Sequence, residues 1–161
     1  MSADFPIADA HQHFWDPRVN YHPWLCDETP IAFRYGDYAA LRRPYLPADY
    51  FADAGAHQVV KTVYVEAEWD PRDPLGETAW VGRLRRETGF PTVMVAQAWL
   101  DRDDIASVLE RQAATRAPEL VPIRHGRMAE SPFAFFRGGA AIMAADLADK
   151  TAQRLGALHK E

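Results

Sequence analysis

Short apolar runs alternate with longer amphipathic stretches along the chain, a pattern typical of α/β proteins, in which strands and helices follow one another. The apolar runs predict four strands, the first opening with residues 5–8 and the others lying at residues 59–66, 92–96 and 120–123. The amphipathic stretches predict helices at residues 47–54, 75–88, 103–112 and 139–158. The pattern therefore predicts successive βα units around a mostly parallel sheet.

Prolines and a glycine mark the ends of several predicted elements. Pro47 stands in the first turn of the first helix, and Gly55 ends that helix. Pro122 has no backbone N–H to donate, so the fourth strand is predicted at an edge of the sheet. Residues 14–47 are rich in proline and aromatic side chains, which indicates a long loop over one end of the sheet, where loops often carry specificity.

The composition is that of an ordinary globular protein, with 48% hydrophobic and 25% charged residues. The 18 basic residues against 23 acidic ones give a net charge of −5, which argues against binding to nucleic acid or to an anionic membrane. No apolar run of about 18 residues predicts a membrane helix, and Asp4 stands where a signal peptide is basic, so we expect a cytoplasmic protein. The single cysteine, Cys26, fits a reducing compartment.

The strongest chemical signal is the pair His11 and His13, which follows the first apolar run. Residues two apart on a strand point the same way, so both imidazoles can converge on one ion or one polarised oxygen. Neutral imidazoles suit Zn²⁺, but a catalytic zinc takes three protein ligands and a water, so the pair alone predicts weak occupancy. The other interpretation is structural, with both imidazoles hydrogen-bonded to neighbouring carbonyl groups. The remaining histidines outside the last strand are predicted at the surface: His22, His57 and His159.

Several segments of the first 115 residues carry a family resemblance. They are Asp9–Asp16 (DAHQHFWD), Leu41–Asp49 (LRRPYLPAD), Val63–Ala67 (VYVEA), Glu77–Trp80 (ETAW) and Val95–Asp101 (VAQAWLD). Together they resemble the amidohydrolase-related family, in particular its fuconolactonase-like and pyrone-dicarboxylate lactonase-like branch. This resemblance covers residues 1–115 and implies a (β/α)8 TIM barrel, with a hydrolytic site at the C-terminal ends of its strands.

The resemblance also implies roles for individual residues. His11 and His13 would be catalytic residues and metal ligands, with Zn²⁺ as the implied cofactor and a metal-free site as the alternative. Glu66, at the end of the second strand, stands where a barrel places substrate-binding side chains, although a strand-end ion pair explains it equally well. Arg124 and His125 would bind a substrate carboxylate and polarise its carbonyl, unless they belong to a different family's segment.

The implied reaction is hydrolysis of a lactone, or a related cyclic ester or amide, of a sugar acid or another carboxylated small molecule. The histidine pair would polarise the carbonyl while a carboxylate on a later strand activates water. A complete barrel needs about 250 residues, whereas the 161 residues here provide three to four βα units. We therefore expect an incomplete (β/α)8 barrel with a helical tail, and a hydrolase that is truncated and inactive as this chain.

A second resemblance begins near residue 109. Residues 109–148 resemble the N-terminal part of a bacterial family of unknown function with a kinase-like fold. The resemblance is carried by the segments Glu119–Met128, Ser131–Gly138 and Ala141–Leu147. The chain is thus predicted to divide into a barrel-like part, 1–115, and a second-family segment, 116–161. A non-catalytic fusion fragment, or a ligand-binding module that self-associates through the open barrel edge, is the alternative function. A phosphotransferase role has less support, because no Gly-rich phosphate loop with its lysine follows.

Overall fold

The computed structural model describes residues 5–31, 36–100 and 102–115, and the backbone of residues 119–125. Its strands are β1 (Ile7–Gln12), β2 (Val59–Val65), β3 (Val93–Ala98) and β4 (Glu119–His125). Its helices are α1 (Pro23–Cys26), α2 (Pro47–Ala54), α3 (Gly76–Thr88) and α4 (Ile105–Ala114), with a 3₁₀ turn η1 (Ala39–Leu41). The predicted strands and the first three predicted helices are confirmed, whereas the predicted helix at 139–158 lies outside the described residues.

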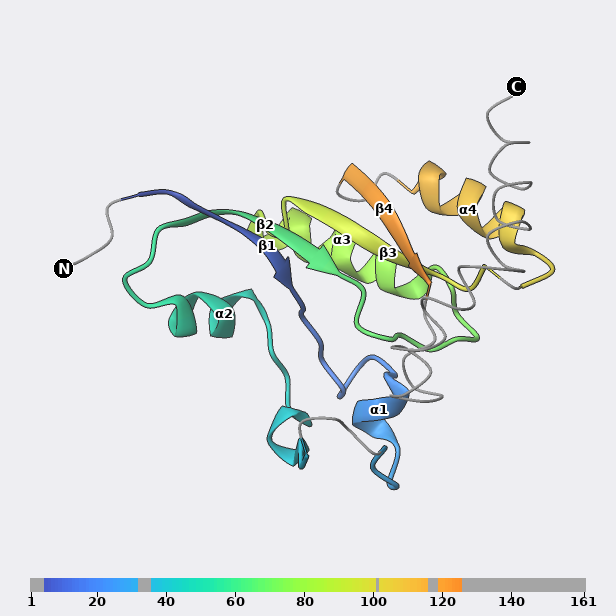
Figure 1. Cartoon of the computed structure of the whole chain (residues 1–161), viewed down its shortest axis with the longest axis horizontal. Helices are drawn as coiled ribbons and strands as arrows, with labels where there is room; N and C mark the ends of the chain where they lie inside the picture. Colours follow the sequence, from blue (N-terminus) through green and yellow to red (C-terminus); the bar gives the residue numbers. More distant parts are fainter. Residues whose placement is uncertain (1–4, 32–35, 101, 116–118, 126–161) are drawn as a thin grey trace.

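The four strands are parallel, and their order in the sheet follows their order in the chain. A helix of eight or more residues lies between each pair of successive strands: α2 between β1 and β2, where the shorter α1 and η1 also lie, α3 between β2 and β3, and α4 between β3 and β4 (Figure 1). Successive βα units have this arrangement, so the predicted α/β class is confirmed. In the described sheet β4 pairs with β3 alone, which confirms the edge position predicted from Pro122.

The core lies between the sheet and its helices, because alternate strand side chains point to the helix side. Tyr64 of β2 and Met94 of β3 are fully buried there. They belong to a cluster of Phe14, Tyr64, Trp69, Trp80, Val81, Leu84, Met94 and Ala96. A second cluster, of Ala98, Ile105 and Val108, joins the end of β3 to α4. Burial of these apolar side chains holds α3 and α4 against the sheet.

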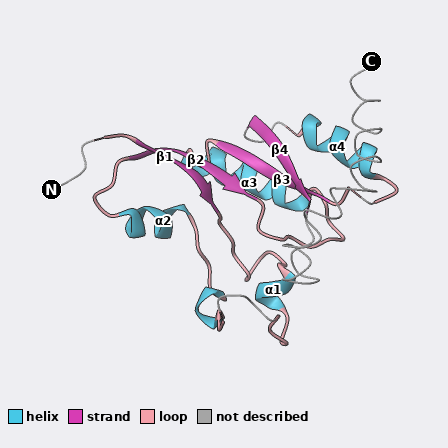
Figure 2. Cartoon of the chain, viewed as in Figure 1, coloured by secondary structure: helices cyan, strands magenta, loops and turns pink. Residues whose placement is uncertain are grey.

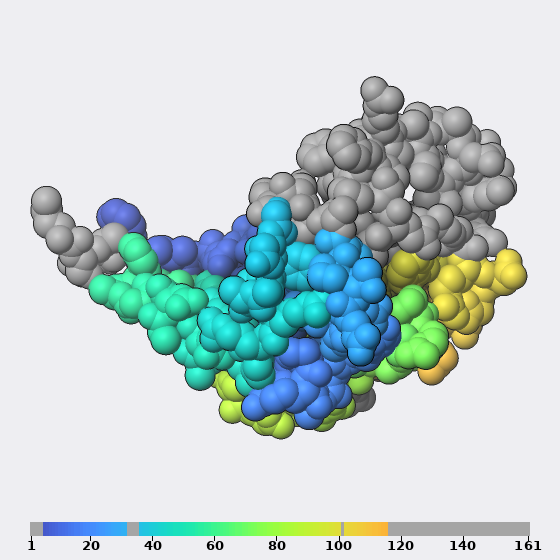
Figure 3. Space-filling model, turned by 90° about the horizontal axis from the view of Figure 1, so that it is seen from below, coloured from blue at the N-terminus to red at the C-terminus, as the bar shows by residue number. Residues whose placement is uncertain are grey.

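The parallel strands all end at one edge of the sheet, which faces the segment that carries α1 and η1 (Figure 2). This segment, residues 14–31 and 36–46, is the predicted long loop with two short helical turns in it, and it forms much of the surface seen in Figure 3. Trp15 connects the beginning of this loop to its end, because its indole Nε1 donates to the carbonyls of Leu41 and Arg43. The residues that follow β1, β2 and β3 therefore lie along one edge beside this loop.

The ends of α2 follow the local signals in the sequence. Pro47 opens the helix, and the Leu46 amide donates to Asp49 Oδ2 at 2.9 Å. Gly55 follows the helix with φ of 57°, a conformation that costs glycine little, so the predicted helix stop is confirmed. Among the described residues, no helix combines the length and the apolar character that crossing a membrane requires.

Candidate functional site

A bulge in β1 sets the direction of the histidine pair. Asp9 lies opposite Thr62 of β2 and Gln12 lies opposite Tyr64, so β1 carries one more residue than β2 over this interval. An extra residue shifts the alternation of side chains between the two faces of a sheet. Asp9 and Phe14 both contact Tyr50 of α2, although they are five positions apart, an odd spacing that simple alternation would place on opposite faces. The bulge therefore lets both face the helices while the histidine pair lies between them.

The two imidazoles converge, as their spacing predicts. His11 Nε2 and His13 Nε2 lie 3.1 Å apart, with ring centroids 4.9 Å apart. His13 Nδ1 lies 2.8 Å from the carbonyl oxygen of Val65, at the end of β2. Because a carbonyl oxygen only accepts, His13 Nδ1 carries the proton, and the lone pair of its Nε2 faces His11. His11 is exposed and His13 is half-buried, so a ligand can reach the pair from solvent.

This geometry fits a bound cation. Zinc binds imidazole nitrogen at about 2.0–2.1 Å, so two nitrogens separated by 3.1 Å can share one ion. A backbone carbonyl that holds the distal ring N–H is the usual second partner of a metal-ligating histidine, and Val65 provides it. Among the described side chains, no group of three His, Cys, Asp or Glu converges on one point. The described part therefore supplies two nitrogen ligands.

The other predicted site residues lie at the same edge of the sheet. Glu66 directly follows β2 and is only 2% exposed, and its Oε2 accepts a hydrogen bond from the Glu68 amide at 2.9 Å. Arg124 and His125 end β4 opposite Gln97 and Ala98 of β3, and the structure describes their backbone alone. Parallel pairing thus brings the ends of β1, β2 and β4 to one edge, and the substrate-binding roles stay predictions.

A buried carboxyl group beside the site has no counterpart among the predicted site residues. Glu77 of α3 is 3% exposed, and its Oε1 accepts from the Tyr64 hydroxyl at 2.8 Å and the Ala67 amide at 2.7 Å. The Tyr64 hydroxyl also lies 3.2 Å from the carbonyl oxygen of Phe14, the residue after His13. Glu77 thereby joins Tyr64 of β2 to the segment that follows β2.

Burial and, second, the negative charge of Glu66 raise the pKa of Glu77 to about 8. The Glu77 side chain is therefore mostly neutral at pH 7. Glu77 opens one of the segments that carry the family resemblance, but its local pattern is a carboxylate in the first turn of a helix, which a helix dipole explains without any further role.

The surface location predicted for His22 is wrong. This residue is fully buried, with its ring edge against Trp69 at 5.2 Å between centroids. Its Nδ1 donates to the Ala67 carbonyl at 2.9 Å, and its Nε2 is buried without a partner in the described structure. The loop folds back on the end of β2, and nothing local in the sequence indicates that return. His57 is exposed, as predicted.

His22 should make the fold acid-sensitive. Burial lowers the pKa of His22 below its usual 6.5, so the unfolded chain binds more protons than the folded one below that pH. The free energy of unfolding should therefore fall as pH drops through about 6.5. We expect His22→Asn, whose amide nitrogen can replace Nδ1 as donor, to lose part of this pH dependence in urea unfolding. His57→Asn is the control, and equal curves for all three proteins would contradict the expectation.

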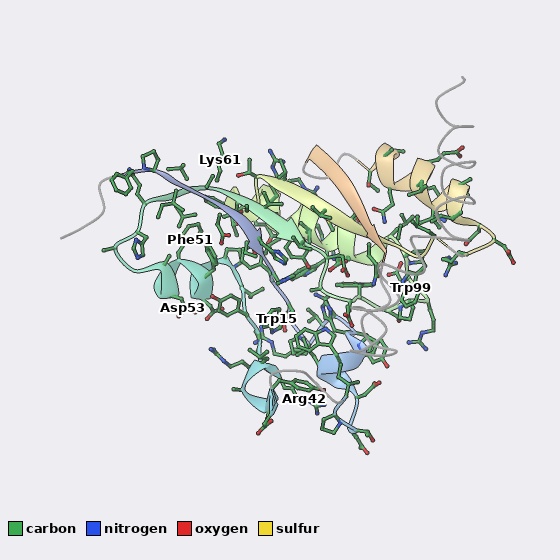
Figure 4. The ribbon with its side chains drawn as sticks, in the orientation of Figure 1. Trp15, Arg42, Phe51, Asp53, Lys61 and Trp99 are labelled. Atoms are coloured by element: carbon green, nitrogen blue, oxygen red, sulfur yellow. The ribbon has the colours of Figure 1, made fainter. Side chains whose placement is uncertain are left out.

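A separate hollow of about 280 Å³ lies between the loop and α2. Its walls are Trp15, Ala40, Leu41, Arg43, Tyr45 and Asp53. Figure 4 shows Trp15 and Asp53 on the α2 side of the molecule and Trp99 at the other end of the strand edge. Neither His11 nor His13 lines this hollow, so it is distinct from the histidine pair. Trp15 is one of the walls of this hollow.

Two solved structures resemble this chain. One is an amidohydrolase from Burkholderia multivorans crystallised with bound zinc, which is 25% identical, has a TM-score of 0.59, and is matched over 91% of this chain and 44% of that one. The other is an amidohydrolase from the same organism with bound HEPES, at 24% identity, a TM-score of 0.58 and the same coverage. These neighbours are amidohydrolases. Their fold is TIM-barrel-like, so the predicted resemblance to amidohydrolases is confirmed at the level of structure.

Two further matches concern proteins without assigned activity. The uncharacterized protein y4mH of Sinorhizobium fredii is 39% identical over 109 residues, which are 67% of this chain and 36% of that protein. A family described as "Uncharacterized protein conserved in bacteria (DUF2252)" matches residues 116–158, so the second predicted resemblance is confirmed over that range. The chain thus spans about a third of this curated relative and under half of each solved neighbour.

Residues 119–125 lie both in the range of the family match and in the sheet. They lie within the range matched by the bacterial family of unknown function, and they also form β4, which pairs in parallel with β3. The sheet therefore continues past residue 115, the predicted boundary between the two parts of the chain. That division stays a prediction.

Proposed function

We propose that the described residues are part of an amidohydrolase-type hydrolase whose His11–His13 pair polarises the carbonyl of its substrate. The observation that carries this proposal is the convergence of two imidazole Nε2 atoms, 3.1 Å apart, at the C-terminal edge of a parallel sheet. Ligand and catalytic groups concentrate at that edge in (β/α)8 enzymes. The zinc-bound amidohydrolase neighbour supports the same assignment.

The proposed substrate is a lactone, or a related cyclic ester or amide, of a carboxylated small molecule. Hydrolysis of such a ring needs a group that withdraws electrons from the carbonyl and a base that activates water. The His11–His13 pair provides the first of these functions. Arg124 and His125, at the end of β4, are the proposed partners of the substrate carboxylate, and Glu66 is the proposed polar group at the end of β2.

His11 and His13 would hold a zinc ion through their Nε2 atoms. Bound there, zinc would supply a Lewis acid for the carbonyl and lower the pKa of water. Val65 keeps the proton on His13 Nδ1, and this leaves Nε2 unprotonated for an ion or for a hydrogen bond from His11. A metal-free site uses the same two side chains, with the proton on His11 Nε2 donated to the substrate carbonyl.

Hydrolysis of a sugar-acid γ-lactone, followed with a pH indicator on the 161-residue chain and added Zn²⁺, tests this proposal. We expect slow turnover at most, because a general base typically contributes about 10²–10⁴-fold and the later-strand carboxylate that the resemblance implies is not among the described residues. The His11→Ala/His13→Ala double variant should hydrolyse the lactone at least about tenfold more slowly than the wild type, because the polarising group is removed. His57→Ala should match the wild type, and a chelator separates the metal-bound from the metal-free site. Equal rates in the wild type and the double variant would refute the proposal.

The match of residues 116–158 to a family of unknown function adds no second activity. The description of that family assigns no reaction, so the match indicates relatedness alone.

A further inference from the structure

Tyr50 of α2 contacts the chain on both sides of the histidine pair. Its hydroxyl donates to Asp9 Oδ2 at 2.7 Å, two residues before His11. Its ring packs edge-on against Phe14, directly after His13, with centroids 6.0 Å apart and an interplanar angle of 85°. One side chain from a helix 41 residues away in sequence thus contacts both ends of the segment that carries the pair.

Asp9 links the Tyr50 hydroxyl to the backbone of His11 through its two carboxylate oxygens. Its Oδ1 accepts from the His11 amide at 3.0 Å, while its Oδ2 accepts from Tyr50. The paired residues of β1 are Asp9 and then Gln12, so the bulge leaves His11 without a partner position on β2. A backbone N–H outside the ladder needs another acceptor, and Asp9 supplies it.

The Tyr50 hydroxyl stays protonated and can always donate its hydrogen bond to Asp9. Burial, and then the hydrogen bond to Asp9, raise the pKa of Tyr50 above its ordinary value, so the hydroxyl keeps its proton at physiological pH. The carboxylate of Asp9 is therefore held at both oxygens, by a side chain of α2 and by the backbone of β1.

We propose that Asp9 and Tyr50 are positioning residues that keep His11 turned towards His13, so that α2 helps to build the site. This inference rests on the proposed function of the pair. The 3.1 Å separation between the two Nε2 atoms needs a defined backbone conformation at His11, an exposed residue whose amide lies outside the ladder. A pre-organised pair binds an ion or an oxygen without first having to order the chain.

Three substitutions in the full chain test the inference. Asp9→Ala removes both hydrogen bonds, Asp9→Asn keeps an oxygen for the His11 amide, and Tyr50→Phe removes the hydroxyl while it keeps the ring on Phe14. Tyr45→Phe is the matched control, because the Tyr45 hydroxyl donates to Asp53 Oδ2 at 2.9 Å and has no contact with the pair. Two quantities are measured for each protein: hydrogen exchange at the His11 amide, and Zn²⁺ affinity by calorimetry.

We expect Asp9→Ala to raise His11 amide exchange about tenfold or more, while the amides of β2 keep their protection. Its Zn²⁺ affinity should fall about 10–100-fold, the usual effect of losing an outer-shell partner. Asp9→Asn should stay within about threefold of the wild type in Zn²⁺ affinity, because its oxygen preserves the amide contact. Tyr50→Phe should give an intermediate loss, and Tyr45→Phe should give none.

Unchanged exchange at His11 together with unchanged Zn²⁺ affinity in Asp9→Ala would overturn the inference. If Asp9→Ala does not fold, Tyr50→Phe decides, since it removes one hydroxyl and no packing. Zinc binding that is equal in the wild type and in His13→Ala would instead refute the proposed function of the pair. In that case the exchange measurement still shows whether Asp9 and Tyr50 hold the backbone of His11.

Discussion

Replacement of Glu77 by alanine is expected to lower the free energy of unfolding by about 3 kcal/mol, the sum of two lost hydrogen bonds and a small cavity. The Tyr64 hydroxyl and the Ala67 amide would both lose the acceptor that they now share inside the protein. Buried donors without acceptors are costly, since they give up water and gain nothing in return. Urea unfolding followed by tryptophan fluorescence measures the change.

Replacement by glutamine separates the charge of Glu77 from its hydrogen bonds. The pKa of Glu77 is about 8 in the folded protein and near 4.5 in the unfolded chain. The folded state therefore binds the extra proton, and its stability falls as pH rises from about 5 to about 8. Glu77→Gln mimics the neutral form, so it should abolish this decline, which we expect to reach at least about 1 kcal/mol between pH 5 and 7.5.

Glu87, exposed on the same helix, supplies the control for both substitutions. Glu87→Gln should leave the free energy of unfolding and its pH dependence as they are in the wild type. Since His22 acts in the opposite direction, below about pH 6.5, the difference between wild type and Glu77→Gln isolates the contribution of Glu77. Parallel pH profiles of these two proteins would contradict a buried neutral carboxyl at Glu77.

Replacement of His13 by alanine is expected to weaken Zn²⁺ binding by at least about 100-fold, because loss of an outer-shell partner alone typically costs 10–100-fold. The substitution removes one of the two Nε2 atoms that lie 3.1 Å apart, and it also removes the ring that Val65 orients. Calorimetric titration of the full chain measures the affinity. His57→Ala, which removes an exposed histidine away from the pair, should bind zinc as the wild type does. An equal loss in His57→Ala would show that zinc binds elsewhere.

Hydrophobic periodicity and turn residues were enough to predict the order of strands and helices. The β-branched run that forms β2 and the amphipathic stretch that forms α3 are long and regular, so their type follows from local pattern. Pro122 also predicted its strand at the edge of the sheet as far as the structure describes it, because a missing N–H disfavours a central position.

The sequence correctly predicted that His11 and His13 converge, but strand alternation alone does not explain their arrangement. Simple alternation places His11 and His13 on one face, but the same rule would place Asp9 with them. The bulge releases Asp9 to face α2. A bulge depends on the register with β2, which lies about fifty residues further along the chain and leaves no local signal.

Contacts between distant segments account for the functional residues that the sequence did not indicate. Tyr50 meets Asp9 across 41 residues, and His22 meets Ala67 across 45. Each of these side chains has an ordinary local context, and only tertiary packing makes it buried or specific. The roles of Glu66, Arg124 and His125 remain predictions from family resemblance.

The measurement that tests the central claim most directly is a Zn²⁺ titration of the ¹⁵N-histidine-labelled chain, followed by long-range ¹H–¹⁵N spectra of its six histidine rings. We predict that the Nε2 signals of His11 and His13 shift together and saturate at one zinc per chain, while His13 Nδ1 keeps its proton and its hydrogen bond to the Val65 carbonyl. Shifts confined to other histidines, or His11 and His13 signals that do not respond together, would contradict it.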